Sequence, residues 1–311
     1  MKLSIICPVY NEAPHIDALV SSLLSDREIE KEIIFADGGS TDGTLQRLEE
    51  LGKKYVNVFV VSNPRRYTNF AFNTARQHAK GKYIAFIGAH AEYPENYFSI
   101  GIQYLEKGEC DVVGGPLHQK GRTHTGKAIA CCMSSKFGVG NTEFRTENKK
   151  KYVDSVAFAI YSRDVFEKAG VMHEDLIINQ DDEFHYRLRK SGFRILMIPE
   201  MRATYYVRET FFELSGQYFR YGLYKPLVFK KVSSGMRPRH IIPSLFTLYL
   251  LSLPLSLYYM FWVIPLLMYL VTDVLFSVLN TGNIIVKLKS ILIFPILHTS
   301  YGTGFIIGLF K

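Results

Sequence analysis

The sequence predicts an α/β fold with a mainly parallel sheet, followed by C-terminal membrane helices. Two observations predict this. Short apolar runs alternate with segments of helical periodicity in the first part of the chain, and residues 241–272 contain no charged side chain. A chain of 311 residues is long enough for one large domain, or for a domain with an appendage.

Five apolar runs have the length and composition of buried strands. After the first run, Ile16, Leu19, Val20 and Leu23 recur at helical spacing, and helical patterns also follow the next three. Strands that alternate with helices of this length imply βαβ units and a mainly parallel sheet. The runs are KLSIICPV (2–9), EIIFAD (32–37), VNVFVV (56–61), KYIAFIG (82–88) and DVVGG (111–115).

The C-terminal part has the composition of membrane segments. A bilayer core is crossed by about 20 apolar residues, so residues 241–272 suffice for two tightly turned crossings. A second apolar run covers residues 291–310. The basic flanks at 230–239 and 287–289 both belong on the cytoplasmic side. We expect a hairpin plus a third crossing. The alternative is a hydrophobic hairpin that enters only one leaflet.

The formal net charge of +8 suggests an anionic partner. Many positive charges fall between residues 202 and 239, just before the most apolar part, which fits anionic lipid better than nucleic acid. The first apolar run is too short for a signal peptide. The cysteines lack C-x-x-C spacing, so we expect reduced thiols in a cytosolic domain; they are Cys7, Cys110, Cys131 and Cys132.

The predicted ligand edge lies beyond the carboxyl ends of the parallel strands. Those ends carry PVYNE (8–12), DGGSTDGT (37–44) and GAHA (88–91). None is a dinucleotide fingerprint or a P-loop. Ser40 or Thr41 could cap the next helix, with Asp42 in its first turn. Asp37 ends a buried strand, where an unpaired carboxylate would be costly, so a capping role does not explain it.

The stretch NQDDEFHYRL (179–188) carries three adjacent acids. Asn179 is a suitable N-cap, and the helix dipole tolerates acids in the first turn. Asp181, Phe184 and Leu188 share one helix face, so Asp181 points toward the core side. An inward carboxylate at a helix start facing a cleft is a candidate general base.

The other two acids have simpler explanations. Glu183 precedes Arg187 by four residues, which predicts a surface ion pair. Asp182 stands at the third helical position, where a carboxylate can accept hydrogen bonds from the free backbone N–H groups.

The motifs together resemble family 2 inverting glycosyltransferases, whose fold is the single nucleotide-binding GT-A domain. PVYNE, DGGSTDGT and QDDEFHYRLRKSG carry this resemblance. GAHAEYP, GKAIA, FGVGN and QYFRYG resemble the branch that makes succinoglycan-type exopolysaccharides. The resemblance covers nearly the whole chain. It implies a catalytic GT-A domain at 1–208, an interfacial acceptor-side segment at 209–240 and transmembrane helices at 241–311.

The resemblance implies a nucleotide site along the predicted edge. Tyr10 would stack on uracil, and Asp37 would accept a hydrogen bond from the base or ribose. Arg65, or its neighbour Arg66, would touch the nucleotide sugar or diphosphate. The residues at the nucleotide-binding positions are Pro8, Tyr10, Glu12, Asp37, Arg65 and Asn73.

The family's D-x-D metal motif corresponds to Gly88-Ala89-His90. The similar branch has D-A-H, which implies that His90 contacts a divalent cation, Mn²⁺ or Mg²⁺, or the diphosphate. An imidazole suits Mn²⁺ better than Mg²⁺. The alternative is a histidine that bonds a loop carbonyl. Gly88 replaces the first acid, which puts one ribose contact in doubt.

The family's E-D pair aligns with Gln180-Asp181, which implies that Asp181 is the base rather than a cap. Gln180 removes a neighbouring negative charge and would weaken that base. One displacement at the anomeric carbon, with Asp181 taking the acceptor proton, would invert configuration. Gln217, Arg220 and Tyr221 match the family's Q-x-x-R-W element on the acceptor and diphosphate side. The alternative is an interfacial amphipathic helix.

The resemblance thus implies a membrane-anchored enzyme that moves a sugar from a UDP-linked donor to a polyprenyl-diphosphate-linked saccharide. Its partners would be the nucleotide sugar, that acceptor and membrane lipids, without nucleic acid, and its catalytic domain would face the cytoplasm at the plasma or inner membrane. Two alternatives remain. Gly88 and Gln180 suit a catalytically impaired sugar-nucleotide binder, and a processive synthase would need a channel that few apolar segments can form.

Overall fold

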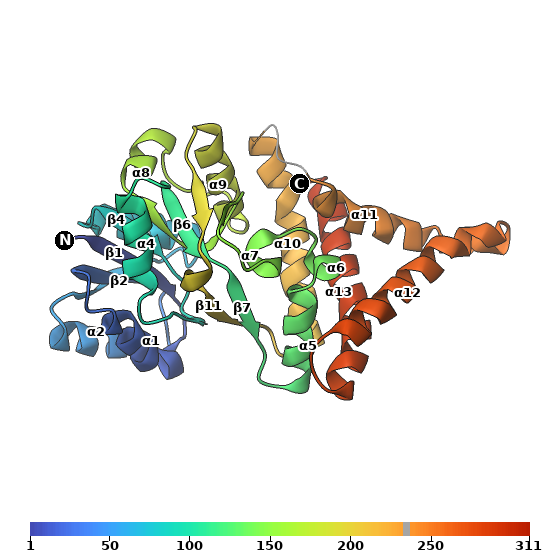
Figure 1. Cartoon of the computed structure of the whole chain (residues 1–311), viewed down its shortest axis with the longest axis horizontal. Coiled ribbons are helices and arrows are strands. Elements are labelled where there is room, and N and C mark those ends of the chain that lie inside the picture. The colour runs from blue at the N-terminus through green and yellow to red at the C-terminus, as the bar shows by residue number, and fades with distance from the viewer. Residues whose placement is uncertain (233–236) are drawn as a thin grey trace. The chain divides into compact units, whose positions relative to one another are not determined.

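The computed structural model describes residues 1–232 and 237–311 (Figure 1). The chain forms two compact units, each assembled from two segments. The first unit comprises Met1–His118 and Glu147–Tyr205, and the second comprises Gln119–Thr146 and Tyr206–Lys311. Residues 119–146 thus group with the C-terminal part, whereas the sequence placed them inside a continuous domain of residues 1–208.

The first unit is built on an eight-stranded sheet of order β3-β2-β1-β4-β9-β6-β10-β8. All seven residues of β2 are buried, as expected for a parallel strand covered on both faces. The strands are β1 (Leu3–Val9), β2 (Lys31–Asp37), β3 (Val58–Ser62), β4 (Tyr83–Phe86), β6 (Val112–Gly115), β8 (Lys151–Tyr152), β9 (Ala157–Ser162) and β10 (Ile195–Met197).

The sheet is mixed but mainly parallel, as predicted. β1 pairs in parallel with β2 and β4, β2 with β3, and β6 with β10. β9 runs antiparallel between β4 and β6, so its first residues lie beside the carboxyl end of β4. No local pattern of residues predicts this insertion. A small sheet of order β5-β11-β7 joins β5 (Ala91–Glu92), β11 (Ala203–Tyr206) and β7 (Leu117–Lys120).

Amphipathic helices connect these strands. Ile16, Leu19, Val20 and Leu23 of α1 are buried, as their spacing predicts. The helices of this unit are α1 (Ala13–Ser25), α2 (Thr44–Lys54), α3 (Thr68–His78), α4 (Tyr97–Glu106), α8 (Asp164–Ala169) and α9 (Gln180–Lys190), with the 3₁₀ turn η1 (Pro199–Met201).

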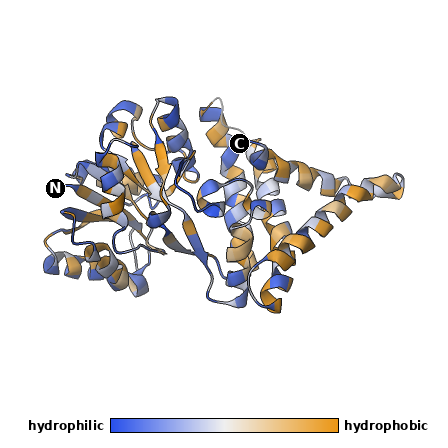
Figure 2. Cartoon of the chain, in the orientation of Figure 1, coloured by the Kyte–Doolittle hydropathy of each residue, from blue (hydrophilic) through white to orange (hydrophobic). Residues whose placement is uncertain are grey.

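The second unit is helical. Its elements are α5 (His124–Met133), α6 (Lys136–Val139), α7 (Glu143–Thr146), α10 (Phe211–Lys231), α11 (Pro238–Leu251), η2 (Leu253–Leu257), η3 (Met260–Val263), α12 (Ile264–Leu279) and α13 (Ile284–Gly308). Two segments of the described residues are long and apolar enough to cross a membrane, Met260–Leu279 and Ile284–Gly308. Figure 2 shows that α11 and α12 are coloured as hydrophobic along most of their length.

Candidate active site

The loops after β1 and β2 are joined by side-chain hydrogen bonds. Asn11 adopts a positive φ of 55°, and its Oδ1 accepts from the backbone N–H of Thr41 at 2.9 Å. The Asn11 N–H donates to Ser40 Oγ at 2.9 Å, and the Glu12 N–H donates to Thr44 Oγ1 at 2.8 Å. These bonds fix the two motifs PVYNE and DGGSTDGT against each other at the carboxyl edge of the sheet.

Asp37 and Asp42 are both satisfied within these loops. Asp37 is buried, and its Oδ2 accepts from the backbone N–H groups of Gly39 (2.8 Å) and Ser40 (3.1 Å). Asp42 accepts from the N–H and hydroxyl of Thr44, and the hydroxyl bond is the main cause of its lowered pKa. The turn thus satisfies both Asp37 carboxylate oxygens, and the contact of Asp37 with a base or ribose stays a prediction. α2 begins at Thr44, so Asp42 precedes the helix and does not lie in its first turn.

Tyr10 and Arg66 come together at the same edge. The guanidinium of Arg66 lies over the Tyr10 ring, 4.9 Å from its centroid, and Arg66 Nη1 is 3.3 Å from the Tyr10 hydroxyl. Tyr10 is 42% exposed, so its ring is accessible from solvent. The neighbouring Arg65 lies instead over Phe70, at 4.7 Å. Of the two arginines that the sequence offered, Arg66 is the one beside Tyr10.

Glu12 and His90 connect the ends of β1 and β4. His90 Nε2 lies 2.6 Å from Glu12 Oε1; the Glu12 side chain is 6% exposed and that of His90 57%. Glu12 Oε2 is buried, and within the described residues it has no hydrogen-bond partner. A buried carboxylate oxygen without a donor is costly unless a cation or a donor joins it. The pair thus presents an accessible imidazole and an unsatisfied oxygen at one place.

Gly88 lies against the ring of Phe158. A Cβ at Gly88 would stand 2.9 Å from Phe158 Cε1, so an aspartate there would collide with the ring. Phe158 has a positive φ of 51°, and its carbonyl accepts from the Tyr97 hydroxyl at 2.7 Å. The Tyr93 hydroxyl bonds both the N–H and the carbonyl of Gly88. This aromatic packing is a physical reason for a glycine at this position.

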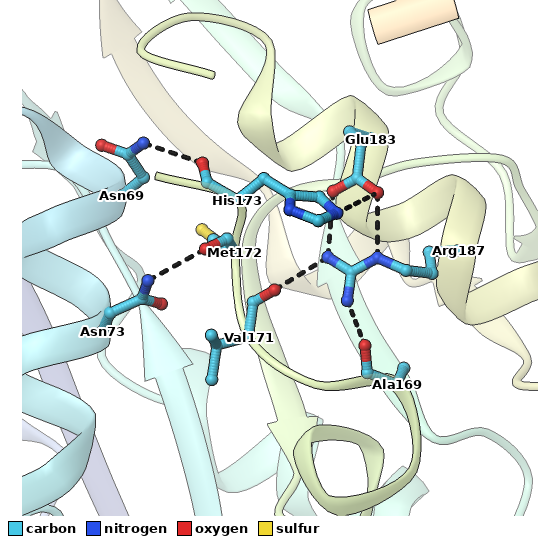
Figure 3. A network of polar contacts seen from close by, with 8 residues as sticks. All are labelled: Asn69, Asn73, Ala169, Val171, Met172, His173, Glu183 and Arg187. Atoms are coloured by element: carbon cyan, nitrogen blue, oxygen red, sulfur yellow. Dashed lines mark hydrogen bonds and ion pairs between the residues drawn. The ribbon is translucent and has the colours of Figure 1, made fainter. Parts of the chain in front are cut away.

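Glu183 is buried, which corrects the surface ion pair that the sequence predicted. The pairing with Arg187 itself is present, but the Glu183 side chain is only 1% exposed. Arg187 also donates to the carbonyls of Ala169 and Val171. Figure 3 shows Arg187 directed between Glu183 and these two carbonyls. The pair therefore ties α9 to the segment that precedes it.

Asp181 lies near the start of α9 and is half-buried. Asn179 occupies the N-cap position, with a positive φ of 61°. The pKa of Tyr161 is raised well above its usual value, first by burial and then by the charge of Asp181. Asp181 is thus within electrostatic range of a buried tyrosine whose ring packs on Phe184, 5.8 Å between centroids. That agrees with an Asp181 side chain on the core-facing side of the helix.

Asn69 and Asn73 of α3 hold the segment before α9. Asn73 Nδ2 donates to the carbonyl of Met172 at 2.9 Å, and Asn69 Nδ2 donates to that of His173 at 2.9 Å (Figure 3). Asn73 is buried. These contacts make Asn73 a residue that positions a loop. Its Oδ1 is buried and has no hydrogen-bond partner among the described residues, and its predicted nucleotide contact stays a prediction.

In the second unit, Gln217 and Tyr221 pair on α10. Gln217 Nε2 donates to the Tyr221 hydroxyl at 3.0 Å, and Tyr221 packs edge-on against Tyr218. Arg220 is exposed on the same helix. The Q-x-x-R-Y sequence therefore forms one turn with a buried amide and an outward guanidinium.

Comparison with known proteins identifies the family. The model of "Glycosyl transferase family 2" matches residues 4–170, which include the loops after β1, β2 and β4. The chain belongs to glycosyltransferase family 2. Within this family it is 31% identical over 242 residues to succinoglycan biosynthesis protein ExoA of Rhizobium meliloti, covering 77% of this chain and 73% of that protein.

Two further proteins place this glycosyltransferase among its relatives. It is 29% identical to the dolichyl N-acetyl-alpha-D-glucosaminyl phosphate 3-beta-D-2,3-diacetamido-2,3-dideoxy-beta-D-glucuronosyltransferase of Methanococcus voltae, covering 74% of each chain. The mannosyltransferase PcManGT of Pyrobaculum calidifontis, solved with GDP-Man and Mn²⁺, superimposes with a TM-score of 0.58 at 18% identity, covering 78% of this chain and 67% of that one. The latter likeness supports the GT-A fold.

Proposed function

We propose that this family 2 glycosyltransferase moves a sugar from a nucleotide sugar, UDP-linked by preference, to a polyprenyl-diphosphate-linked saccharide. Two relatives support the acceptor class, since one is named for succinoglycan biosynthesis and the other for a dolichyl phosphate acceptor. The observation that carries the site is the Glu12–His90 pair, which offers an unsatisfied carboxylate oxygen and an exposed imidazole at the ligand edge.

Tyr10, Arg66 and Pro8 would bind the nucleotide. The exposed Tyr10 ring offers a stacking face for a base, and Arg66 beside it brings a positive charge suited to phosphate. Pro8 is half-buried near the end of β1, two residues before Tyr10. The preceding residue, Arg65, lies over the ring of Phe70, and we do not assign it a nucleotide contact.

The donor set fits a divalent cation that is shared with the substrate. The described residues contain no group of three His, Cys, Asp or Glu side chains placed to hold an ion alone. Glu12 and His90 would therefore supply two ligands, and diphosphate oxygens and water the others, as is usual for Mg²⁺ and Mn²⁺ at phosphates. When bound, such a cation offsets the charge that grows on the departing diphosphate.

Asp181 is the proposed general base. Its half-buried carboxylate at the start of α9 would take the proton of the acceptor hydroxyl as that oxygen attacks the anomeric carbon. The bond from the sugar to the diphosphate breaks on the opposite face, so an α-linked donor gives a β-linked product. Glu183 is committed to Arg187 and is not available for this step.

A lipid-linked acceptor requires that the enzyme reach a membrane. The second unit exposes many large apolar side chains, and basic residues flank them at 230–239. We propose that this unit anchors the enzyme to the cytoplasmic face, and that Gln217, Arg220 and Tyr221 of α10 serve the acceptor diphosphate. The exposed guanidinium of Arg220 has the right charge for that group.

A donor panel tests the proposal. Purified full-length protein is incubated with UDP-, GDP- and dTDP-sugars, with and without Mn²⁺ or Mg²⁺, and with polyprenyl-diphosphate-linked saccharide. We expect nucleoside diphosphate release that needs both acceptor and cation, and a product extended by one sugar. Long polymer would favour a processive synthase. Nucleotide binding without release from any donor would favour a sugar-nucleotide binder.

A further inference from the structure

One face of helix α13 packs inside the second unit along the length of the helix, whereas Leu288, Leu292 and Ile307 are exposed. In its first half, the Cys132 Sγ lies 3.9 Å from the Ser290 carbonyl, and Phe294 packs on Phe137 with 4.9 Å between centroids. In its second half, Gly304 and Gly308 lie against the backbone of α10 at Phe219 and Leu223, with no room for a side chain. α13 therefore cannot separate from α5, α6 and α10.

The neighbouring helix α10 is too highly charged to lie in the hydrocarbon core of a bilayer. It carries charged side chains from one end to the other, at Glu213, Arg220, Lys225, Lys230 and Lys231. Charged residues at the centre of a bilayer cost several kcal/mol each by insertion scales, roughly 2.5–3.5. Because the second half of α13 lies side by side with α10, a crossing by α13 would carry the charged side chains of α10 into the hydrocarbon.

The α11–α12 hairpin differs from α13, because only its base is attached to other helices, and there α12 buries Asp273 and Ser277 while Leu275 and Leu279 stay exposed. Thr247 of α11 lies against Gly302 of α13, and the Tyr269 hydroxyl of α12 is 2.8 Å from His298 Nδ1. Between these two attachments, residues 248–268 contain no charged side chain. Leu257, Tyr258, Met260 and Phe261 at the turn are each at least 74% exposed.

The free part of the hairpin is too short to span a bilayer. Its limbs have about ten residues each, part α-helix and part 3₁₀-helix, which at a rise of about 1.5–2.0 Å per residue gives a reach of about 15–18 Å. The hydrocarbon core is about 30 Å thick, so this reach covers one leaflet. The hairpin turn is also held together: Trp262 Nε1 donates to Ser252 Oγ at 3.0 Å, and the Tyr249 hydroxyl donates to the Trp262 carbonyl at 2.7 Å.

We infer that residues 248–268 form a hairpin that enters a single leaflet, and that none of the helices in the described part of the chain crosses the membrane. This inference rests on the membrane association in the proposed function and specifies its form. Basic residues at the hairpin base, including Arg237 and Arg239, would then meet anionic headgroups. The C-terminus at Lys311 and the catalytic unit would lie on the same side of the membrane.

Site-specific labelling distinguishes insertion from crossing. Full-length protein is expressed in cells with a single introduced cysteine at Val56, Leu257 or Lys311, and a membrane-impermeant maleimide is applied from either side. We expect Lys311→Cys to react from the same side as Val56→Cys, and Leu257→Cys to be protected from both sides. Reaction of Leu257→Cys or Lys311→Cys from the side opposite Val56→Cys overturns the inference and leaves the membrane association intact.

Trp262, the single tryptophan of the chain, gives an independent measure of depth. Its fluorescence is recorded in anionic vesicles whose lipids carry bromine at shallow or deep acyl positions. We expect the strongest quenching from deep bromines; a crossing hairpin would place its turn at the far interface, and shallow bromines would quench most.

Flotation with the same vesicles tests the association itself. Failure of the unmodified protein to float rejects the membrane anchoring of the proposed function, and this inference with it. The double substitution Leu257→Asp and Phe261→Asp should reduce the floated fraction at least tenfold, whereas Val56→Asp, at an exposed apolar position of the first unit, should leave it unchanged. Unchanged flotation of the double variant overturns the assignment of the hairpin.

Discussion

Glu183 and Arg187 form a two-point ion pair inside the first unit. Arg187 Nε lies 2.9 Å from Glu183 Oε1, and Nη2 lies 2.9 Å from Oε2. The same guanidinium bonds the carbonyls of Ala169 and Val171, so one cation completes the ion pair and two backbone acceptors. Of the three adjacent acids, Glu183 has the spacing of a surface ion pair, yet its side chain is buried and stabilises the fold.

Glu183→Gln should destabilise the first unit. Loss of one partner leaves the Arg187 charge in a low-dielectric site, which typically costs about 3 kcal/mol or more. We expect a lower midpoint in urea unfolding, with activity per folded molecule largely kept. Asp182→Asn, at a half-buried neighbour on the same turn, is the matched control and should unfold at nearly the original midpoint. Equal midpoints for both variants would contradict the structural role of Glu183.

Asp181→Asn should abolish turnover while nucleotide affinity is kept. The amide has the same shape but cannot take a proton, and loss of a general base typically costs about 10²- to 10⁴-fold in rate. The measurement is nucleoside diphosphate release, paired with calorimetric binding of the nucleotide. Asp182→Asn again serves as control and should keep its turnover. An Asp181→Asn enzyme as fast as the original would remove the proposed base.

Gly88→Asp should be poorly tolerated unless Phe158 is changed as well. The aspartate Cβ would stand 2.9 Å from the Phe158 ring, and overpacking of this kind costs about 1–3 kcal/mol. Phe158→Gly removes the ring and suits the positive φ of 51°. Because the two residues are in contact, the double variant should lose less stability than the sum of the single variants. Strict additivity of the melting-point shifts would contradict this contact.

Much of the first unit follows from local sequence patterns. The strands and helices up to β6 appear where apolar runs and helical spacing predict them, because both signals depend on near neighbours in sequence. The loops at the carboxyl edge follow for the same reason. Asp37 is an exception. Its burial suggested an unpaired carboxylate, but the turn that follows it supplies hydrogen bonds from the Gly39 N–H and the Ser40 hydroxyl, and burial alone does not predict these bonds.

The remaining features depend on contacts between distant segments. β9 enters antiparallel between β4 and β6, which no local pattern specifies. The reason for Gly88 is the ring of Phe158 on that strand, and the burial of Glu183 comes from the segment that packs over it. The sequence alone shows that Gly88 departs from the motif, and only the structure shows that Phe158 occupies the space of a side chain there.

Asn73→Ala should lower stability without weakening nucleotide binding. The Asn73 amide donates to the Met172 carbonyl inside the unit, and its loss leaves a buried acceptor unpaired, at a cost of about 1–3 kcal/mol. Thermal unfolding and nucleotide titration measure the two effects separately. Arg66→Ala, at an exposed residue beside Tyr10, should do the opposite and weaken nucleotide binding with little change in melting point. A fall in nucleotide affinity for Asn73→Ala that equals that of Arg66→Ala would restore Asn73 to the nucleotide site.

His185 should make the first unit sensitive to mild acid. The ring is buried between Ser155 Oγ, 2.8 Å from Nδ1, and the Tyr161 hydroxyl, 2.9 Å from Nε2. Burial lowers the pKa of His185 from 6.5 to about 4. Between about pH 6.5 and pH 4, His185 is therefore protonated in the unfolded chain but neutral in the folded chain. The contribution of this group to the free energy of unfolding should be fully present above about pH 6.5. It should fall by at most about 3 kcal/mol as the pH drops toward 4.

The test compares urea midpoints at several pH values for the original protein and His185→Gln. A glutamine amide can still donate and accept a hydrogen bond but does not titrate in this range, so the variant should lose less stability between pH 6.5 and 4.5 than the original. His78→Gln, at an exposed histidine of α3, should keep the original slope. Parallel curves for the original protein and His185→Gln would mean that the folded and unfolded chains bind this proton equally, which would contradict a lowered pKa of His185 in the fold.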